Sequence, residues 1–160
     1  MKEFRKISVI GLGLIASSIC LTLRQKDPTI KLVGYDRDKV VLNRAKKIGL
    51  CKVESNLDNA VSGSQLIVLC VPVGQMQSVT QRLKKIIEPG TTITDVGSVK
   101  LSVIEEIESN IESVGGKYVP SHPIAGTERS GPDAGYAGLF EGRWCILTPT
   151  KKTNKKALNS

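Results

Sequence analysis

The sequence has 160 residues, 40% of them hydrophobic, and a net charge of +8 that arises from 23 Lys and Arg against 15 Asp and Glu. This length fits one domain with its own core. No apolar run approaches the roughly 20 residues of a membrane span, and residues 1–6 (MKEFRK) do not have the form of a secretion signal, so we expect a cytoplasmic protein. The basic residues are spread over several segments and 4% of the chain is aromatic, which excludes nucleic acid as the favoured partner and equally suits a small anionic ligand.

Apolar runs of strand length alternate with segments of helical period in the first half of the sequence. We predict strands at 6–11, 31–36, 52–54 and 65–71, and helices at 14–25 and 38–48. Asp38 is a natural N-cap for the second helix, and Gly49 ends it. The run at 65–71 is continuously apolar, as is typical of a central parallel strand buried on both faces.

The second half of the sequence continues the same alternation. It predicts helices at 75–87 and 100–113, and strands at 91–96, 117–121 and 144–148. The predicted fold class is therefore α/β: a doubly wound, mostly parallel, Rossmann-like sheet with helices on both faces. We expect residues 1–150 to form an NAD(P)-binding domain and residues 151–160 a basic tail, in which a helix could start at Thr153 or Asn154.

The four cysteines are far apart in the sequence, at Cys20, Cys51, Cys70 and Cys145. They form no CxxC pair, and no histidine cluster lies near them to complete a zinc site. We therefore predict free, buried thiols and no metal site.

The strongest local motif is GLGLIA at residues 11–16, which lies between the first predicted strand and the first predicted helix. Gly11 permits a tight turn, Gly13 lets the backbone approach a pyrophosphate, and Ala16 is small enough for the helix to pack on the strand. The helix N-terminus, at Leu14 and Ile15, offers unpaired amide donors to the phosphates. The motif therefore predicts a dinucleotide site.

An acidic residue, Asp36, follows the second predicted strand, 20 positions beyond Ala16. Its carboxylate would accept hydrogen bonds from the adenosine ribose and would repel a 2′-phosphate, which favours NAD over NADP. Arg37 weakens this preference because an arginine there can hold the 2′-phosphate. The alternative is that Asp36 is only a solvated residue at the end of a strand.

Further candidates follow the fourth, fifth and sixth predicted strands, where open α/β sheets place their ligands. Val71, Pro72 and Val73 form a bend that can pack against the cofactor. Gly97 and Ser98 follow the fifth strand, and Ser98 is either a helix N-cap, a functional group, or both.

His122 is the single histidine of the sequence and follows the sixth predicted strand. A lone histidine is more often structural, but this one lies in a polar, glycine-rich loop. That position suits a general base, since an imidazole ordinarily titrates near neutrality.

Four motifs together resemble the prephenate and arogenate dehydrogenases of tyrosine biosynthesis, the TyrA family, in their nucleotide-binding domain. They are GLGLIASS at the first turn, DVGSVK after the fifth strand, HPIAGTERSGP after the sixth, and LFEGRWCILTPT at residues 139–150. The resemblance covers essentially the whole sequence. The segment that contains the histidine is far more specific than the glycine turn.

The resemblance implies oxidation of prephenate or arogenate by NAD or NADP with loss of the ring carboxylate as carbon dioxide; prephenate would give 4-hydroxyphenylpyruvate. It also implies that His122 is the catalytic histidine and Ser98 its helper, and it assigns Thr127, Glu128 and Ser130 to the substrate site. His122 would accept the hydroxyl proton as hydride leaves the same carbon.

Members of this family continue into a helical domain that mediates dimerisation and supplies an arginine for the substrate carboxylate, and this sequence stops before it. We therefore expect a cofactor-binding half that binds NAD and turns prephenate over poorly or not at all, with a homodimer in the full-length family and no nucleic-acid or membrane partner. The alternatives are a non-catalytic NAD-binding module, an arogenate dehydrogenase, or another β-hydroxyacid-type or imine-reducing dehydrogenase, in which HPIAGTERSGP is not expected.

Overall fold

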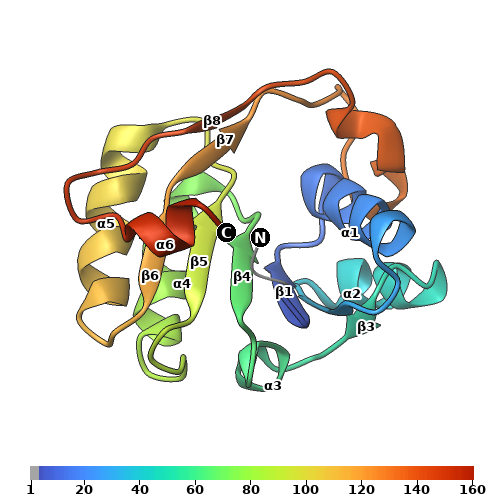
Figure 1. Ribbon diagram of the computed structural model, residues 1–160. Coiled ribbons are helices and arrows are strands. Elements are labelled where there is room, and N and C mark those ends of the chain that lie inside the picture. Colours follow the sequence, from blue (N-terminus) through green and yellow to red (C-terminus); the bar gives the residue numbers. More distant parts are fainter. Residues whose placement is uncertain (1–3) are drawn as a thin grey trace.

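Six parallel strands form one sheet in the computed structural model, which describes residues 4–160 and the side chains of all of these except Glu106. The strand order is β3-β2-β1-β4-β5-β6 (Figure 1). Successive strands are added on one side of β1 up to β3, and from β4 onward they are added on the other side. This change in strand order confirms the doubly wound, Rossmann-like fold. The strands are β1 (Lys6–Ile10), β2 (Lys31–Tyr35), β3 (Lys52–Val53), β4 (Leu66–Leu69), β5 (Thr92–Asp95) and β6 (Lys117–Val119).

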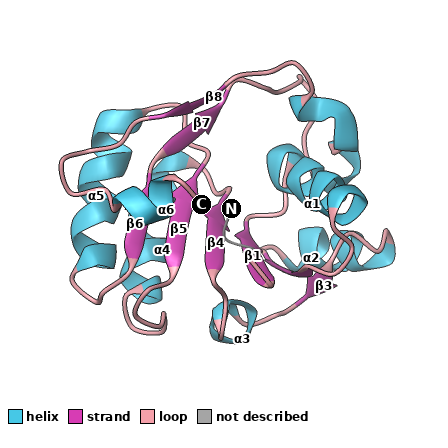
Figure 2. Cartoon of the chain, viewed as in Figure 1, coloured by secondary structure: helices cyan, strands magenta, loops and turns pink. Residues whose placement is uncertain are grey.

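Helices cover both faces of the sheet (Figure 2). One core packs α1 and α2 against the sheet through residues such as Val9, Cys20 and Leu42, and the other packs α3, α4 and α5 through residues such as Ile67 and Ile107. Successive strand residues supply opposite cores because side chains alternate across a strand. The helices are α1 (Leu14–Lys26), α2 (Lys39–Lys47), α3 (Leu57–Val61), α4 (Met76–Leu83), α5 (Lys100–Glu112) and α6 (Lys155–Leu158).

Most predicted elements are confirmed within a few residues. The helix expected at 75–87 is shorter, with a 3-10 turn at Val73–Gln75 before α4, which ends at Leu83. The short helix α3 was missed: Asn56 caps it by accepting a hydrogen bond from the Asp58 amide at 2.7 Å. Asp38 caps α2 as predicted, through the Val40 amide at 2.7 Å.

The strand expected at 117–121 is interrupted at Pro120, which has no N–H to donate to a sheet. β6 stays in the parallel sheet, whereas β7 (Ser121–Pro123) leaves it and pairs antiparallel with β8 (Cys145–Leu147). The strand predicted at 144–148 therefore exists, in a separate two-stranded sheet.

Residues 151–160 fold back onto the domain. Asn154 caps α6 by accepting hydrogen bonds from the amides of Lys156 and Ala157 at 3.0 and 3.1 Å. Ala157 is buried, and α6 contacts β6. The residues that follow β8 thus complete the packing beside the outermost strand of the sheet.

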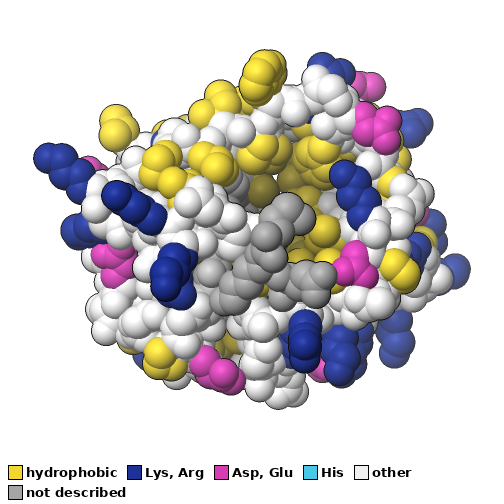
Figure 3. Space-filling model, in the orientation of Figure 1, with side chains coloured by type: hydrophobic (Ala, Val, Ile, Leu, Met, Phe, Trp, Pro, Cys, Tyr) yellow, Lys and Arg dark blue, Asp and Glu magenta, His cyan; other side chains and the backbone are white. Residues whose placement is uncertain are grey.

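Hydrophobic side chains line a hollow on the face of the molecule that Figure 3 presents. Two neighbouring cavities open there, and both are lined by Ile19, Val68 and Phe140. Within residues 4–160, no helix is long and apolar enough to cross a bilayer; α1 and α5 have 13 residues each.

All four cysteines are free thiols, as predicted. Cys20 is fully buried, Cys51 and Cys70 are half-buried, and Cys145 is exposed, so the expectation of burial is confirmed for Cys20 and wrong for Cys145. Cys145 lies on β8, outside the main sheet, and no helix layer covers it. In the described part of the chain, no group of three or more His, Cys, Asp or Glu could hold a metal ion.

Candidate functional site

The turn after β1 can be made only with glycine at its first position. Gly11 has a φ of +90°, and a methyl group there would lie 2.8 Å from the carbonyl oxygen of Cys70, at the end of β4. The Gly11 amide donates to the carbonyl of Tyr35 at 2.8 Å. The turn is therefore held against both neighbouring strands.

The first turn of α1 has no side-chain cap and begins beside open space at Gly13. Gly13 is the N-cap residue, and no side chain caps the helix. A methyl group on Gly13 would meet no atom within 4 Å, whereas Ala16, on the packed side, is fully buried. This is the geometry that a pyrophosphate needs, because the helix N-terminus carries partial positive charge and unpaired N–H donors.

Asp36 fixes the turn as well as the end of β2. One carboxylate oxygen, Oδ2, accepts a hydrogen bond from the Leu12 amide at 2.8 Å, and the other, Oδ1, accepts one from the Asp38 amide at 2.9 Å. Each oxygen retains a lone pair, so the carboxylate can still accept from a ribose diol. Asp36 therefore fixes the glycine turn and is not simply a solvated residue at the end of a strand, while its role toward a ribose stays a prediction.

A cavity of about 380 Å³ lies at this edge of the sheet and brings together six of the predicted cofactor residues. They are Gly11, Gly13, Asp36, Arg37, Val71 and Pro72. Leu14, Ile15, Val73 and Gly97 are not part of its lining. The sequence did not indicate several other lining residues, among them Asp38, Val41, Gln75, Val79 and Gly131.

Gly131 reaches this cavity because the loop after β7 crosses the molecule to α1 and α2. Tyr136 donates its amide hydrogen to Ser18 Oγ at 3.1 Å, and Thr22 Oγ1 donates to the carbonyl of Ala137 at 2.7 Å. An ion pair between Arg44 and Asp133 fastens the same loop to α2. The loop is the long connection that passes over the top of the molecule in Figure 1.

Thr127, Glu128 and Ser130 lie on this crossing loop, and all three are exposed. The loop joins the strand that carries His122 to the edge of the dinucleotide cavity. Along the chain, these three positions therefore lie between His122 and the residue that reaches the dinucleotide cavity, Gly131, and they are accessible to a ligand.

Ser98 and His122 follow adjacent strands of the sheet. Ser98 is exposed and lies three residues after the end of β5, and His122 is half-buried on β7, opposite Ile146 of β8. Val99, rather than Ser98, occupies the N-cap position of α5, so the reading of Ser98 as a simple N-cap is wrong. Neither residue lines the dinucleotide cavity.

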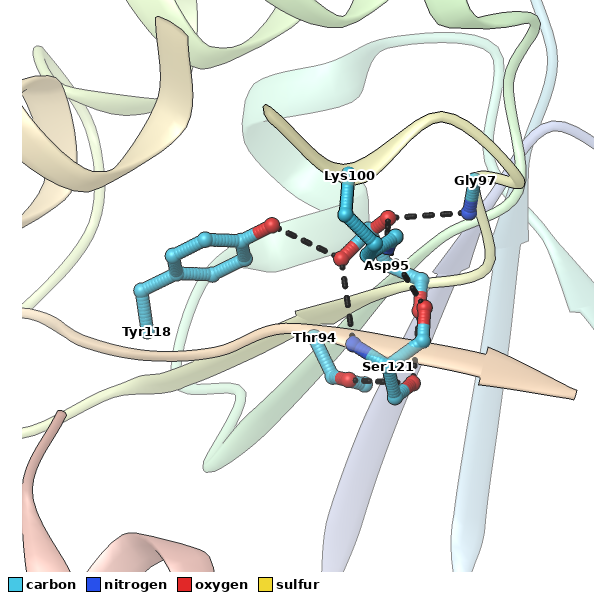
Figure 4. Close-up of polar contacts among 6 residues, drawn as sticks. All are labelled: Thr94, Asp95, Gly97, Lys100, Tyr118 and Ser121. Atoms are coloured by element: carbon cyan, nitrogen blue, oxygen red, sulfur yellow. Dashed lines mark hydrogen bonds and ion pairs between the residues drawn. The ribbon is translucent and has the colours of Figure 1, made fainter. Parts of the chain in front are cut away.

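A buried carboxylate, Asp95, lies at the end of β5 between these two segments (Figure 4). Its oxygens accept hydrogen bonds from four donors: Tyr118 Oη at 2.7 Å, the Gly97 amide at 2.8 Å, Lys100 Nζ at 2.5 Å and the Ser121 amide at 3.3 Å. Burial, together with the nearby Asp95 charge, raises the pKa of Tyr118 well above its ordinary value, so this hydroxyl remains a donor.

The segment DVGSVK was recognised as a motif, but no role was predicted for Asp95 or Lys100. A signal was available, because Asp95 is a charged residue at the end of the apolar run TTITDV. A carboxylate in that position is buried only when it is paired. Its partners Tyr118, on β6, and Ser121, at the start of β7, could not be identified from spacing.

Residues 19–160 match the family model described as prephenate dehydrogenase, nucleotide-binding domain. The chain is 39% identical over 159 residues to the cyclohexadienyl dehydrogenase of Zymomonas mobilis, covering 99% of this chain and 54% of that protein. The chain spans about half the length of the curated relatives it matches.

Solved structures give the same result. The prephenate dehydrogenase of A. aeolicus, in complex with hydroxyphenyl propionate and NAD+, superposes with a TM-score of 0.90 at 30% identity, over 99% of this chain and 55% of that one. The arogenate dehydrogenase of Synechocystis superposes with a TM-score of 0.87 at 29% identity, over 96% and 53% of the two chains.

Proposed function

Because this chain belongs to the family of the prephenate dehydrogenase nucleotide-binding domain, we propose that it binds NAD+. We further propose that it carries the catalytic histidine of a dehydrogenase that oxidises and decarboxylates prephenate. The observation that carries the proposal is the placement of its parts. The glycine turn, Ser98 and His122 all follow the carboxyl ends of parallel strands, at one edge of the sheet. Ligands of open α/β sheets bind at that edge.

NAD+ fits the residues at the glycine turn. The uncapped N-terminus of α1 would bind the pyrophosphate, and the open space beside Gly13 would admit it. Asp36 would accept hydrogen bonds from the ribose diol, and its charge would disfavour the 2′-phosphate of NADP+. Leu14 and Ile15 would contribute backbone amides, while Val71, Pro72, Val73 and Gly97 would contact the remainder of the cofactor.

The reaction requires a proton acceptor beside the ring carbon that loses hydride. NAD+, when bound, supplies the hydride acceptor. His122 would accept the hydroxyl proton, and Ser98 would orient the imidazole and the nicotinamide end of the cofactor. Loss of carbon dioxide then makes the ring aromatic, so the reaction proceeds in one direction.

The substrate would lie against the exposed loop that carries Thr127, Glu128 and Ser130. Prephenate and arogenate differ in a side-chain keto or amino group, and both solved relatives above keep the fold of this chain. We propose prephenate as the substrate and include arogenate in the test. A cytoplasmic enzyme and a homodimer of the full-length polypeptide are parts of the same proposal.

The test is turnover with His122→Asn. Because the chain spans about half the length of its relatives, the assay joins these 160 residues to the second half of the Zymomonas mobilis relative and follows NADH with prephenate and with arogenate. We expect His122→Asn to lower turnover by about 10²- to 10⁴-fold and to leave NAD+ affinity nearly unchanged. The 160-residue chain alone should bind NAD+ and turn prephenate over poorly or not at all.

Two results would contradict the proposal. A joined protein that binds NAD+ but turns over neither substrate would point to a binding module without chemistry. A His122→Asn variant with unchanged turnover would remove the histidine from the mechanism.

A further inference from the structure

The two oxygens of the Asp95 carboxylate contact the two segments that carry Ser98 and His122. Oδ2 accepts the amide hydrogen of Gly97, the residue directly before Ser98, at 2.8 Å. Oδ1 accepts the amide hydrogen of Ser121, the residue directly before His122, at 3.3 Å. One buried side chain therefore joins the backbone beside both candidate groups (Figure 4).

The amide, hydroxyl and carbonyl groups of Ser121 all form hydrogen bonds. Besides its amide, its hydroxyl donates to the carbonyl oxygen of Asp95 at 2.6 Å and lies 2.9 Å from Thr94 Oγ1. Its carbonyl oxygen accepts a hydrogen bond from Lys100 Nζ at 2.7 Å. The backbone that leads into His122 consequently has little freedom to rotate.

Lys100 closes the arrangement from the other side. Its ammonium group contacts Asp95 Oδ2 at 2.5 Å as well as the Ser121 carbonyl, and its side chain is only 15% exposed. A carboxylate as deeply buried as Asp95 is stable only with such a partner and with its lone pairs occupied. Because Lys100 is the first residue of α5, the ion pair also fixes the start of that helix, two positions after Ser98.

We propose that Asp95, with Lys100, is the positioning residue of the site, fixing Ser98 and His122 relative to each other without touching the substrate. The assignment of those two residues to catalysis rests on the proposed function; the contacts of Asp95 do not. Gly97 packs closely against the same carboxylate, since a methyl group there would lie 3.0 Å from Asp95 Oδ2 and 3.2 Å from Met76 Cε. A larger residue there would require the Asp95 carboxylate or the Met76 side chain to shift by a few tenths of an ångström.

The test compares Asp95→Asn with Tyr118→Phe in the 160-residue chain. An asparagine amide has only one accepting oxygen, so it can accept from Gly97 and Lys100 or from Ser121 and Tyr118, but not from both pairs, and one of the two segments is released. Tyr118→Phe removes one donor from the same carboxylate and leaves the Gly97 and Ser121 contacts in place. Both variants weaken the buried cluster, and only the first separates the two segments.

The readout is NMR, because His122 is the single histidine and its imidazole gives one unambiguous set of signals. We expect Asp95→Asn to shift the Ser98 amide and His122 imidazole resonances, and Tyr118→Phe to leave both near their wild-type values. Affinity for ADP-ribose, which lacks the nicotinamide ring, should stay within about twofold of wild type in both variants, because the glycine turn is a separate site. Urea unfolding of each variant gives the accompanying loss of stability.

Equal Ser98 and His122 shifts in the two variants would overturn the proposal and leave Asp95 a purely structural residue. If Asp95→Asn does not fold, Lys100→Gln replaces it; this change removes the charge that joins Asp95 to the Ser121 carbonyl and should shift the same resonances. Wild-type resonances in folded Lys100→Gln would equally overturn it. Failure of NAD+ binding would count against the proposed function alone, since the spectra are recorded without ligand.

Discussion

The two ends of the site are built in different ways. The dinucleotide end is made from one short stretch of chain, in which the backbone of Gly11 and Gly13 and the first turn of α1 provide the contacts and Asp36 fastens the turn. The catalytic end, as we propose it, joins the segments that follow β5 and β6 through the charged side chains of Asp95 and Lys100. The first end depends on the absence of side chains, and the second depends on one buried carboxylate.

This difference predicts how each end responds to substitution. Adding an atom should damage the dinucleotide end, either in folding or in ligand binding, according to which glycine is changed. Removing a charge or a hydroxyl should damage the catalytic end, where the contacts join residues that are far apart in the sequence. One of these residues, Tyr118, has a raised pKa.

The largest effect on stability should come from Gly11→Ala. Alanine disfavours a φ of +90°, and its methyl group would lie 2.8 Å from the Cys70 carbonyl oxygen. Strain and overlap together should lower the free energy of unfolding by about 3 kcal/mol, measured by urea denaturation. A wild-type transition midpoint would mean that the turn is not as close to β4 as described.

Gly13→Ala is the matched control for the same turn and should act on the ligand instead of the fold. Its methyl group meets no protein atom within 4 Å, so the urea midpoint should not change. NAD+ affinity should fall by at least about tenfold, or 1.4 kcal/mol, because the methyl group enters the space assigned to the pyrophosphate. Unchanged affinity measured by calorimetry would separate this turn from dinucleotide binding.

The catalytic end should lose stability at alkaline pH through Tyr118. Burial and Asp95 raise the folded-state pKa of Tyr118, so the unfolded chain releases this proton first and stability is retained below about pH 10 and lost above it. From pH 10 to 11, wild type should lose about 1 kcal/mol more than Tyr118→Phe, which has no hydroxyl to ionise. Parallel pH profiles for the two proteins would contradict the buried Tyr118–Asp95 contact.

The smallest effect should be a change in cofactor preference on Asp36→Asn. The substitution removes the charge that opposes a 2′-phosphate and keeps one oxygen for the Leu12 or Asp38 amide. The preference for NAD+ over NADP+ should fall about fivefold, or about 1 kcal/mol. Asp38→Asn, two positions on, is the control and should preserve most of the preference.

The same contrast explains what the sequence could and could not predict. The order of strands and helices and the glycine turn were predicted because each depends on local periodicity or on residues close together in the chain. Asp36 was predicted from its place at the end of β2 as an acceptor for a ribose, whereas its contact with the Leu12 amide was not predicted. The break at Pro120 was missed because the apolar run continues through it, although proline cannot donate to a sheet.

The Asp95 cluster could not be assembled from the sequence, because Gly97, Lys100, Tyr118 and Ser121 meet only when β5 and β6 pair. Gly131 was missed for the same reason, since it reaches the dinucleotide cavity through the loop that begins after β7, which follows the edge strand β6. Contacts between distant segments depend on strand register and loop path, and neither is encoded in local spacing.

Calorimetric titration of the 160-residue chain with NAD+ and NADP+ in parallel determines whether the glycine turn binds a dinucleotide. We expect binding of NAD+ at one site per chain, with weaker binding of NADP+ because of the Asp36 carboxylate. Absence of heat with both dinucleotides, from a chain that unfolds cooperatively, would contradict the assignment of the glycine turn as a dinucleotide site.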